Sequence, residues 1–151
     1  GKKLGFRADF DALPIDETID LPYGSTIPGV SHKCGHDGHS ASLAAFAMEV
    51  DQRGCDNTVY FIFQHAEETG DGAKVCAAIV EEEGIEAVYA YHNEPGIPLG
   101  ELAIRRGTHF CASKGMSMYF EGIPAHASDP GMGRNPAQAI ARLIREIVFA
   151  K

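Results

Sequence analysis

The sequence predicts an α/β fold in which a largely parallel sheet is flanked by helices. Three short strand-like runs, 4–9, 59–63 and 87–91, alternate with two segments of helical periodicity, 40–52 and 73–83. This alternation is typical of parallel sheets, because the chain must cross back before the next parallel strand can begin. The run 59–63 is continuously apolar, as expected for a strand that is covered on both faces.

The ends of these elements have local causes. In the first helix, apolar residues recur three and four positions apart, and Asp37 or Ser40 is placed to cap its start. Gly84 is expected to end the second helix. The intervening region 10–38 is rich in proline and glycine and is predicted to be mostly irregular. A loop of that length in a compact domain is usually functional.

The pattern changes in the last third of the chain. We predict a further strand at 100–105 and a half-exposed strand at 114–121, where polar and apolar residues alternate. Asn135 is expected to cap an amphipathic helix that follows it. We therefore predict a partial catalytic domain, 1–110, and the start of a smaller α+β domain, 111–151.

Composition excludes several classes of function. The chain has 151 residues, 44% of them hydrophobic, a net charge of -8 and no basic run, which argues against a nucleic-acid partner. No apolar run approaches the roughly 20 residues of a membrane helix. Four scattered cysteines do not suit a secreted disulfide scaffold, so we expect a cytoplasmic protein.

One segment concentrates groups that bind metals. Residues 31–39 (SHKCGHDGH) hold one thiol, one carboxylate and three imidazoles. Such ligands suit zinc, manganese or cobalt better than calcium or magnesium. Cys34 and His36 lie two positions apart and would project to the same side of an extended backbone. The alternative is a polar loop with an incidental cysteine.

Further candidates follow the predicted strands. Asp9 ends the first strand, Glu67 and Glu68 follow the second, and His92 follows the third. Ligands bind beyond the carboxyl ends of parallel strands, so these residues are expected to meet at one rim. Adjacent residues on an extended chain point apart, so the two glutamates should differ in role. One would bind a metal and the other would accept a proton from metal-bound water, whose pKa falls to about 7. The alternative is a solvated acidic turn.

Five motifs together resemble a known family. They are 7–14 (RADFDALP), 31–39 (SHKCGHDGH), 66–68 (AEE), 92–93 (HN) and 125–127 (AHA). In this order they resemble the hippuricase and N-acyl-amino-acid amidohydrolase branch of the aminoacylase and glutamate-carboxypeptidase metallopeptidases, over essentially the whole chain. The resemblance implies a zinc-peptidase-like catalytic domain, a lid or dimerisation domain, and hydrolysis of the amide bond of N-acyl amino acids.

The resemblance also implies roles for individual residues. Glu67 would be the general base, and Asp9 would orient the metal site from behind. His126 would be the lid-domain histidine that holds the substrate carbonyl or carboxylate, reaching an active site across a dimer. Two divalent ions (zinc, manganese, cobalt or nickel) would be bound, with Cys34 as a bridge. The implied metal ligands are Cys34, His36, Glu68 and His92.

Several features depart from the family pattern. His65 stands where many members have proline, and 123–125 replaces the usual glycines before His126. The family's further metal-binding histidine comes from a C-terminal segment, and its N-terminal helical segment also lies outside this sequence. We therefore expect a central fragment of a longer enzyme.

Two other readings stay open. The chain could be a non-catalytic metal-binding or dimerising domain, or a thiol enzyme that uses Cys34 with a histidine base. We expect a small N-acyl amino acid or short peptide as substrate, a homodimer formed through the lid domain, and neither a nucleic acid nor a membrane as partner. Asp11 is expected to be a loop or capping carboxylate. Structural or supporting roles are expected for the remaining histidines, His32, His39, His65 and His109.

Overall fold

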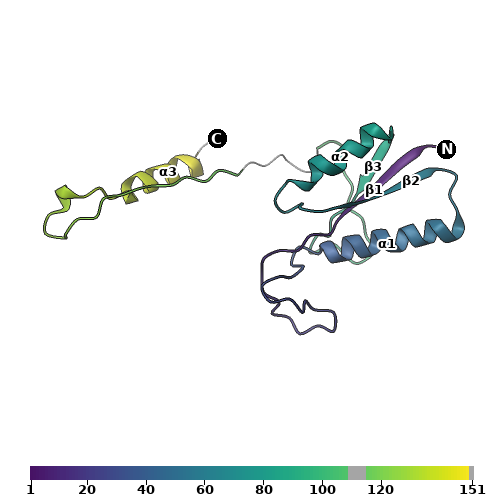
Figure 1. Ribbon diagram of the computed structural model, residues 1–151, viewed down its shortest axis with the longest axis horizontal. Helices are drawn as coiled ribbons and strands as arrows, with labels where there is room; N and C mark the ends of the chain where they lie inside the picture. The colour runs from purple at the N-terminus through teal and green to yellow at the C-terminus, as the bar shows by residue number, and fades with distance from the viewer. Residues whose placement is uncertain (109–114, 150–151) are drawn as a thin grey trace. The chain divides into compact units, whose positions relative to one another are not determined.

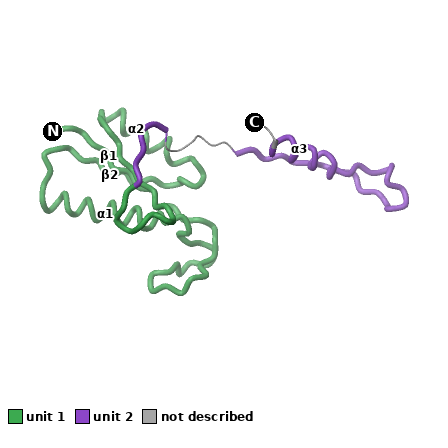
Figure 2. The backbone as a smooth tube through the Cα atoms, turned by 180° about the vertical axis from the view of Figure 1, so that it is seen from behind, with its two compact units in different colours: residues 1–102 green, residues 103–151 purple. Residues whose placement is uncertain are grey.

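The computed structural model (Figure 1) describes residues 1–108 and 115–149. The chain divides into two compact units, Gly1–Leu102 and Ala103–Lys151 (Figure 2), and each is described by itself. The predicted division between residues 110 and 111 lies outside the described residues, as does His109. The identity of the second unit as the start of a lid or dimerisation domain stays a prediction.

The first unit is built on a three-stranded sheet in which both strand pairs are parallel. The central strand is β1, so the order is β2-β1-β3. Phe6 stands opposite Phe61 on one side and Tyr89 on the other. The predicted α/β fold class is confirmed. The strands are β1 (Lys3–Asp9), β2 (Thr58–Gln64) and β3 (Ala87–Ala90).

Helices α1 (His36–Arg53) and α2 (Gly72–Glu82) lie on opposite faces of this sheet (Figure 1). On the α1 face, the ring of Phe46 meets Phe6 edge-on, with ring centroids 4.8 Å apart. Phe61, the partner of Phe6 on β2, also faces α1. Side chains alternate along a strand, so Tyr60, the residue before Phe61, points to the other face. Its hydroxyl donates to Glu83 at the end of α2.

The start of α1 differs from the prediction. The helix begins at His36, because Gly35 at its N-cap adopts a left-handed conformation with φ 91° that a glycine accepts without strain. Neither predicted cap is used, since the Ser40 hydroxyl donates to the His36 carbonyl inside the helix. The end of α2 agrees with the prediction, because Gly84 follows it with φ 63°.

The long loop before α1 is ordered by its own contacts. Leu13 and Ser31 form an isolated antiparallel bridge, and the Ser31 hydroxyl donates to the Ile15 carbonyl at 2.7 Å. An ion pair between Lys33 and Glu17 adds a second tie. The predicted irregular region is confirmed, except that its last three residues belong to α1. These contacts fix the backbone that leads into Cys34.

The second unit contains a 3-10 helix η1 (Pro130–Met132) and a helix α3 (Ala137–Phe149). The predicted cap is present, since Asn135 Oδ1 accepts a hydrogen bond from the Ala137 N–H at 2.9 Å. The strands predicted at 100–105 and 114–121 are wrong for the described residues, where neither segment has a partner strand. Within residues 1–108 and 115–149, no helix is long and apolar enough to cross a membrane.

Candidate metal centre

The carboxyl ends of the three strands and the start of α1 meet at one rim of the sheet. Three overlapping groups of side chains there have potential ligand atoms within 4.8 Å of one another. The predicted convergence of separate segments therefore occurs. The groups are Cys34 with His36 and His92, His36 with Glu67 and Glu68, and Asp9 with His36 and His39.

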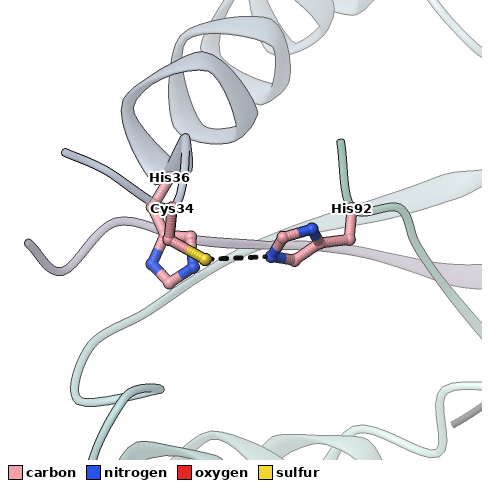
Figure 3. Close-up of side chains that lie close together, drawn as sticks. All are labelled: Cys34, His36 and His92. Atoms are coloured by element: carbon pink, nitrogen blue, oxygen red, sulfur yellow. Dashed lines mark hydrogen bonds between the residues drawn. The ribbon is translucent and has the colours of Figure 1, made fainter. Parts of the chain in front are cut away.

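The first group is drawn in Figure 3, where Cys34 and His92 face each other beside the ring of His36. The Cys34 sulfur lies 3.4 Å from His92 Nε2. A tetrahedral metal with bond lengths of about 2.0–2.3 Å holds its ligand atoms about 3.3–3.6 Å apart. The separation of these two atoms therefore fits a shared metal ion.

Cys34 and His36 come together for a different reason from the one predicted. The backbone between them is not extended, because Gly35 is left-handed and His36 is already helical. The turn at Gly35 directs both side chains to the same rim. The proximity inferred from the i, i+2 spacing is present, but the extended backbone assumed for it was wrong.

His36 is the most enclosed member of the cluster, with 0% of its surface exposed. Its Nδ1 lies 3.1 Å from the carbonyl oxygen of Asp11, an acceptor only, so Nδ1 carries the proton. The Nε2 atom is buried and has no hydrogen-bond partner in the part of the chain that the structure describes. An unsatisfied buried nitrogen costs about 1–3 kcal/mol. A cation on this lone pair would remove that cost.

Carboxylates surround this nitrogen. Glu68 Oε1 lies 3.8 Å and Glu67 Oε2 3.9 Å from His36 Nε2. The expectation that the two glutamates point apart was therefore wrong. They lie on a turn rather than an extended segment, since Ala66 just before them is left-handed with φ 49°, a strained position for a residue with a side chain.

Asp9 is buried beside the rim, and its expected part in orienting a metal site stays a prediction. Its Oδ2 pairs with Arg7 Nη1 at 2.7 Å, and its Oδ1 accepts a hydrogen bond from His39 Nδ1 at 2.6 Å. Burial alone would raise the pKa of Asp9, but the hydrogen bond from His39 and the charge of Arg7 outweigh it and lower the pKa. Asp9 is therefore held ionised, and it contacts the helix that carries His36.

Asp11 is a supporting residue whose part in the site the sequence did not reveal. It accepts the Nδ1–H of His36 through its backbone carbonyl, and its Oδ2 accepts the backbone N–H of Glu68 at 3.1 Å. Burial acts to raise the pKa of Asp11, but the backbone hydrogen bonds of Glu68 and Glu67 lower it. The sequence feature that could have identified Asp11 is its position, two residues beyond Asp9 and just past the end of β1.

The electrostatics of the rim favour a cation. Burial raises the pKa of the Cys34 thiol, and the negative charges of Glu68 and Glu67 raise it further. Without a metal, the thiol therefore keeps its proton. A bound cation reverses this balance, because coordination favours the thiolate. The donor set of thiolate, imidazole and carboxylate fits zinc and its neighbours.

The remaining predicted residue, His126, belongs to the second unit. It is exposed, and its Nδ1 lies 2.8 Å from the Ser128 hydroxyl. Together with Arg134 and Asn135 it lines a hollow of about 370 Å³. Its predicted action on a substrate stays a prediction.

Comparisons with known proteins agree with this chemistry. Residues 5–149 match the model of peptidase family M20/M25/M40. N-acetylcysteine deacetylase of Bacillus subtilis (strain 168) is 36% identical over 146 residues, which cover 95% of this chain and 38% of that protein. The chain thus spans little more than a third of this relative's length.

Two solved structures are similar. One is the Bacillus subtilis YXEP protein, a dinuclear metal binding peptidase from the M20 family, with 43% identity and a TM-score of 0.62 over 66% of this chain and 29% of that one. The other is a putative aminohydrolase from methicillin-resistant Staphylococcus aureus, with 29% identity and a TM-score of 0.69 over 99% of this chain and 42% of that one.

Proposed function

The chain belongs to peptidase family M20/M25/M40, and on that premise we propose that the whole protein hydrolyses the amide bond of N-acyl amino acids with the help of divalent metal ions. The observation that carries the proposal is the buried Nε2 of His36, which has no hydrogen-bond partner among the described residues and lies among carboxylates. We place the protein in the hippuricase and N-acyl-amino-acid amidohydrolase branch on the motifs given above.

We assign the metal ligands as Cys34, His36, Glu68 and His92, with Cys34 as a bridge between two ions. The name of a similar protein, a dinuclear metal binding peptidase, supports two ions in the whole protein. Zinc, manganese, cobalt and nickel all suit these ligands. When bound, the ions would polarise the amide carbonyl and lower the pKa of the attacking water.

Glu67 is assigned as the general base. Its side chain is 40% exposed, against 27% for Glu68, so the Glu67 side chain is the more open to water and substrate, although Glu68 is the more exposed residue once the backbone is included. The Glu67 carboxylate takes a proton as the water oxygen bonds to the amide carbon. It then gives the proton to the departing nitrogen as the carbon–nitrogen bond breaks. The products are a carboxylate and the free amine of the amino acid.

The substrate class rests on the relatives. One of them is named for removing an acetyl group from N-acetylcysteine. We propose an N-acyl amino acid or short peptide as substrate, His126 as the residue that holds its carbonyl or carboxylate, and a homodimer through the second unit. The same family membership leaves room for a metal-binding domain without turnover, which is an outcome of the test below. A thiol enzyme is disfavoured because burial and the surrounding carboxylates raise the pKa of Cys34.

The test is turnover of a series of N-acetyl amino acids by the whole protein, before and after metal removal. Chelation should abolish turnover, and added zinc, manganese or cobalt should restore it. Glu67→Gln should reduce kcat about 100- to 10,000-fold with metal content unchanged, whereas Glu68→Gln should lower metal content. Metal binding without turnover of any member would favour the non-catalytic domain. Turnover that survives complete metal removal would overturn the proposal.

A further inference from the structure

We propose that His39 and Asn93 form a clasp that holds His92 in place against Cys34, which makes both of them positioning residues of the metal centre. The inference rests on the proposed metal site. Neither residue is among the ligands or catalytic groups assigned above. His39 lies in helix α1, which starts at the metal-binding motif, and Asn93 lies in the segment that follows strand β3. Their contact joins these two parts of the chain.

The first half of the clasp is a hydrogen bond between residues 54 positions apart. His39 Nε2 bonds Asn93 in one of two ways: unprotonated, it accepts the backbone N–H of Asn93 at 2.9 Å, and protonated, it donates to Asn93 Oδ1 at 2.8 Å. The other nitrogen of His39 donates to Asp9. His39 is only 1% exposed, so its ring bridges the end of β1 and the segment after β3 from a buried position.

The second half is a close approach at Gly35. A Cβ atom at this position would lie 2.8 Å from Asn93 Nδ2 and 2.9 Å from Asn93 Oδ1. The missing side chain therefore makes room for the Asn93 amide directly beside the backbone that joins Cys34 to His36. Asn93 thus contacts both sides of the site, at Gly35 and at His39.

The consequence falls on His92, the residue before Asn93. The Nδ1–H of His92 donates to the Asn93 carbonyl at 2.7 Å, which leaves the lone pair of Nε2 directed at the Cys34 sulfur. The rings of His39 and His92 also meet edge-on, with centroids 4.6 Å apart. The residue that fixes the tautomer and orientation of His92 is itself fixed by His39. Groups that orient a ligand in this way typically change metal affinity about 10–100-fold when they are removed.

The experiment measures cobalt binding by the whole protein and by its variants Asn93→Ala and His39→Ala. Affinity is obtained by competition with a chelator, and the ligand-field and thiolate-to-cobalt absorption bands are recorded at saturation. Each variant should bind cobalt about 10–100-fold more weakly and show altered bands even when saturated. A loss of folded protein alone would not change the bands of the saturated protein. His32→Ala removes an exposed imidazole from the same motif and should leave both quantities unchanged.

His39 is fully buried, so circular dichroism checks the folding of its variant, and Asn93→Ala, at an exposed residue, supplies the independent test. If both residues act through one clasp, the loss of binding free energy in the double variant should be smaller than the sum of the losses in the two single variants. Unchanged affinity and bands in a folded Asn93→Ala variant would overturn the clasp while leaving the metal centre standing. Failure of the unaltered whole protein to bind cobalt would overturn the metal centre and the clasp together.

Discussion

The rim of the sheet and the faces of the sheet are organised in opposite ways. Among the described residues, the side chains that are less than 2% exposed are polar except for that of Ala8, and the polar ones lie at or beside the rim. On the faces, large apolar side chains stay open, and Phe63 and Phe46 are 41% and 37% exposed. The enclosed polar residues are Asp9, Ser31, His36 and His39.

This contrast shows which kind of interaction fixes the geometry of the rim. Burying polar groups is costly unless they are paired, so a tightly enclosed polar cluster indicates a site rather than a structural core. Among the described residues, the buried side-chain atoms without a hydrogen-bond partner are His36 Nε2, in this cluster, and Asp11 Oδ1, beside it. The apolar core of the first unit is small by comparison, with Ala8, Leu43 and Ile85 buried. The geometry of the rim is therefore set by hydrogen bonds more than by apolar packing.

Of the substitutions that compare the two regions, Cys34→Ser at the rim is expected to have the largest effect. A serine hydroxyl is a much weaker ligand than a thiolate at neutral pH, so zinc affinity should fall by about 100-fold or more. Because binding requires loss of the thiol proton, affinity of the unaltered chain should rise with pH, and the variant should lose much of that rise. Calorimetric titration across a pH series measures both. Cys55→Ser, at an exposed cysteine, is the matched control, and an equal loss there would refute the role of Cys34.

A smaller effect is expected for two glycine substitutions, one beside the glutamate turn and one in the first turn of α1. A Cβ at Gly72 would lie 1.6 Å from the His65 carbonyl oxygen, just before the glutamate turn, whereas Gly38 in α1 has open space around it. Gly72→Ala should destabilise the fold by about 1–3 kcal/mol through overpacking. Gly38→Ala should stabilise α1 by about 0.5–1 kcal/mol. Urea unfolding curves measure both changes, and equal effects would mean that the turn is not tightly constrained.

The smallest effect concerns the second unit, whose helix is held by a local cap. Asn135→Ala removes the acceptor for the Ala137 N–H and should cost about 1 kcal/mol of helix stability. Hydrogen exchange of the first-turn amides of α3 should accelerate accordingly. Asn135→Asp keeps an acceptor at the same position and should exchange at the original rate. Acceleration in both variants would indicate that the side chain does not act as a cap.

Much of the fold could be predicted because it depends on local patterns. Apolar runs and helical spacing place β1, β2, β3, α1 and α2 to within a few residues, and the parallel arrangement predicts a shared rim. The strands expected at 100–105 and 114–121 show the limit of such patterns. A strand needs a hydrogen-bonded partner, and the alternation of residues in one segment does not provide it.

Supporting roles were expected for Asp9 and His39, but the contacts that the supporting groups make could not be predicted, because these contacts join distant segments. His39 and Asn93 are 54 positions apart in the sequence, and no local sequence pattern indicates that they pair. The left-handed residues Gly35 and Ala66 each redirect the chain, which is why both glutamates turn toward His36. Side-chain spacing on an assumed extended backbone cannot anticipate such turns.

The measurement that tests the central claim most directly is X-ray absorption at the zinc edge of the zinc-loaded chain. The account predicts a sulfur scatterer at about 2.3 Å together with nitrogen or oxygen scatterers at about 2.0–2.2 Å, with multiple scattering from imidazole rings. The sulfur contribution should disappear in Cys34→Ser, and the imidazole contribution should decrease in His36→Ala. A spectrum with oxygen scatterers alone, unchanged by either substitution, would contradict a metal centre at this rim.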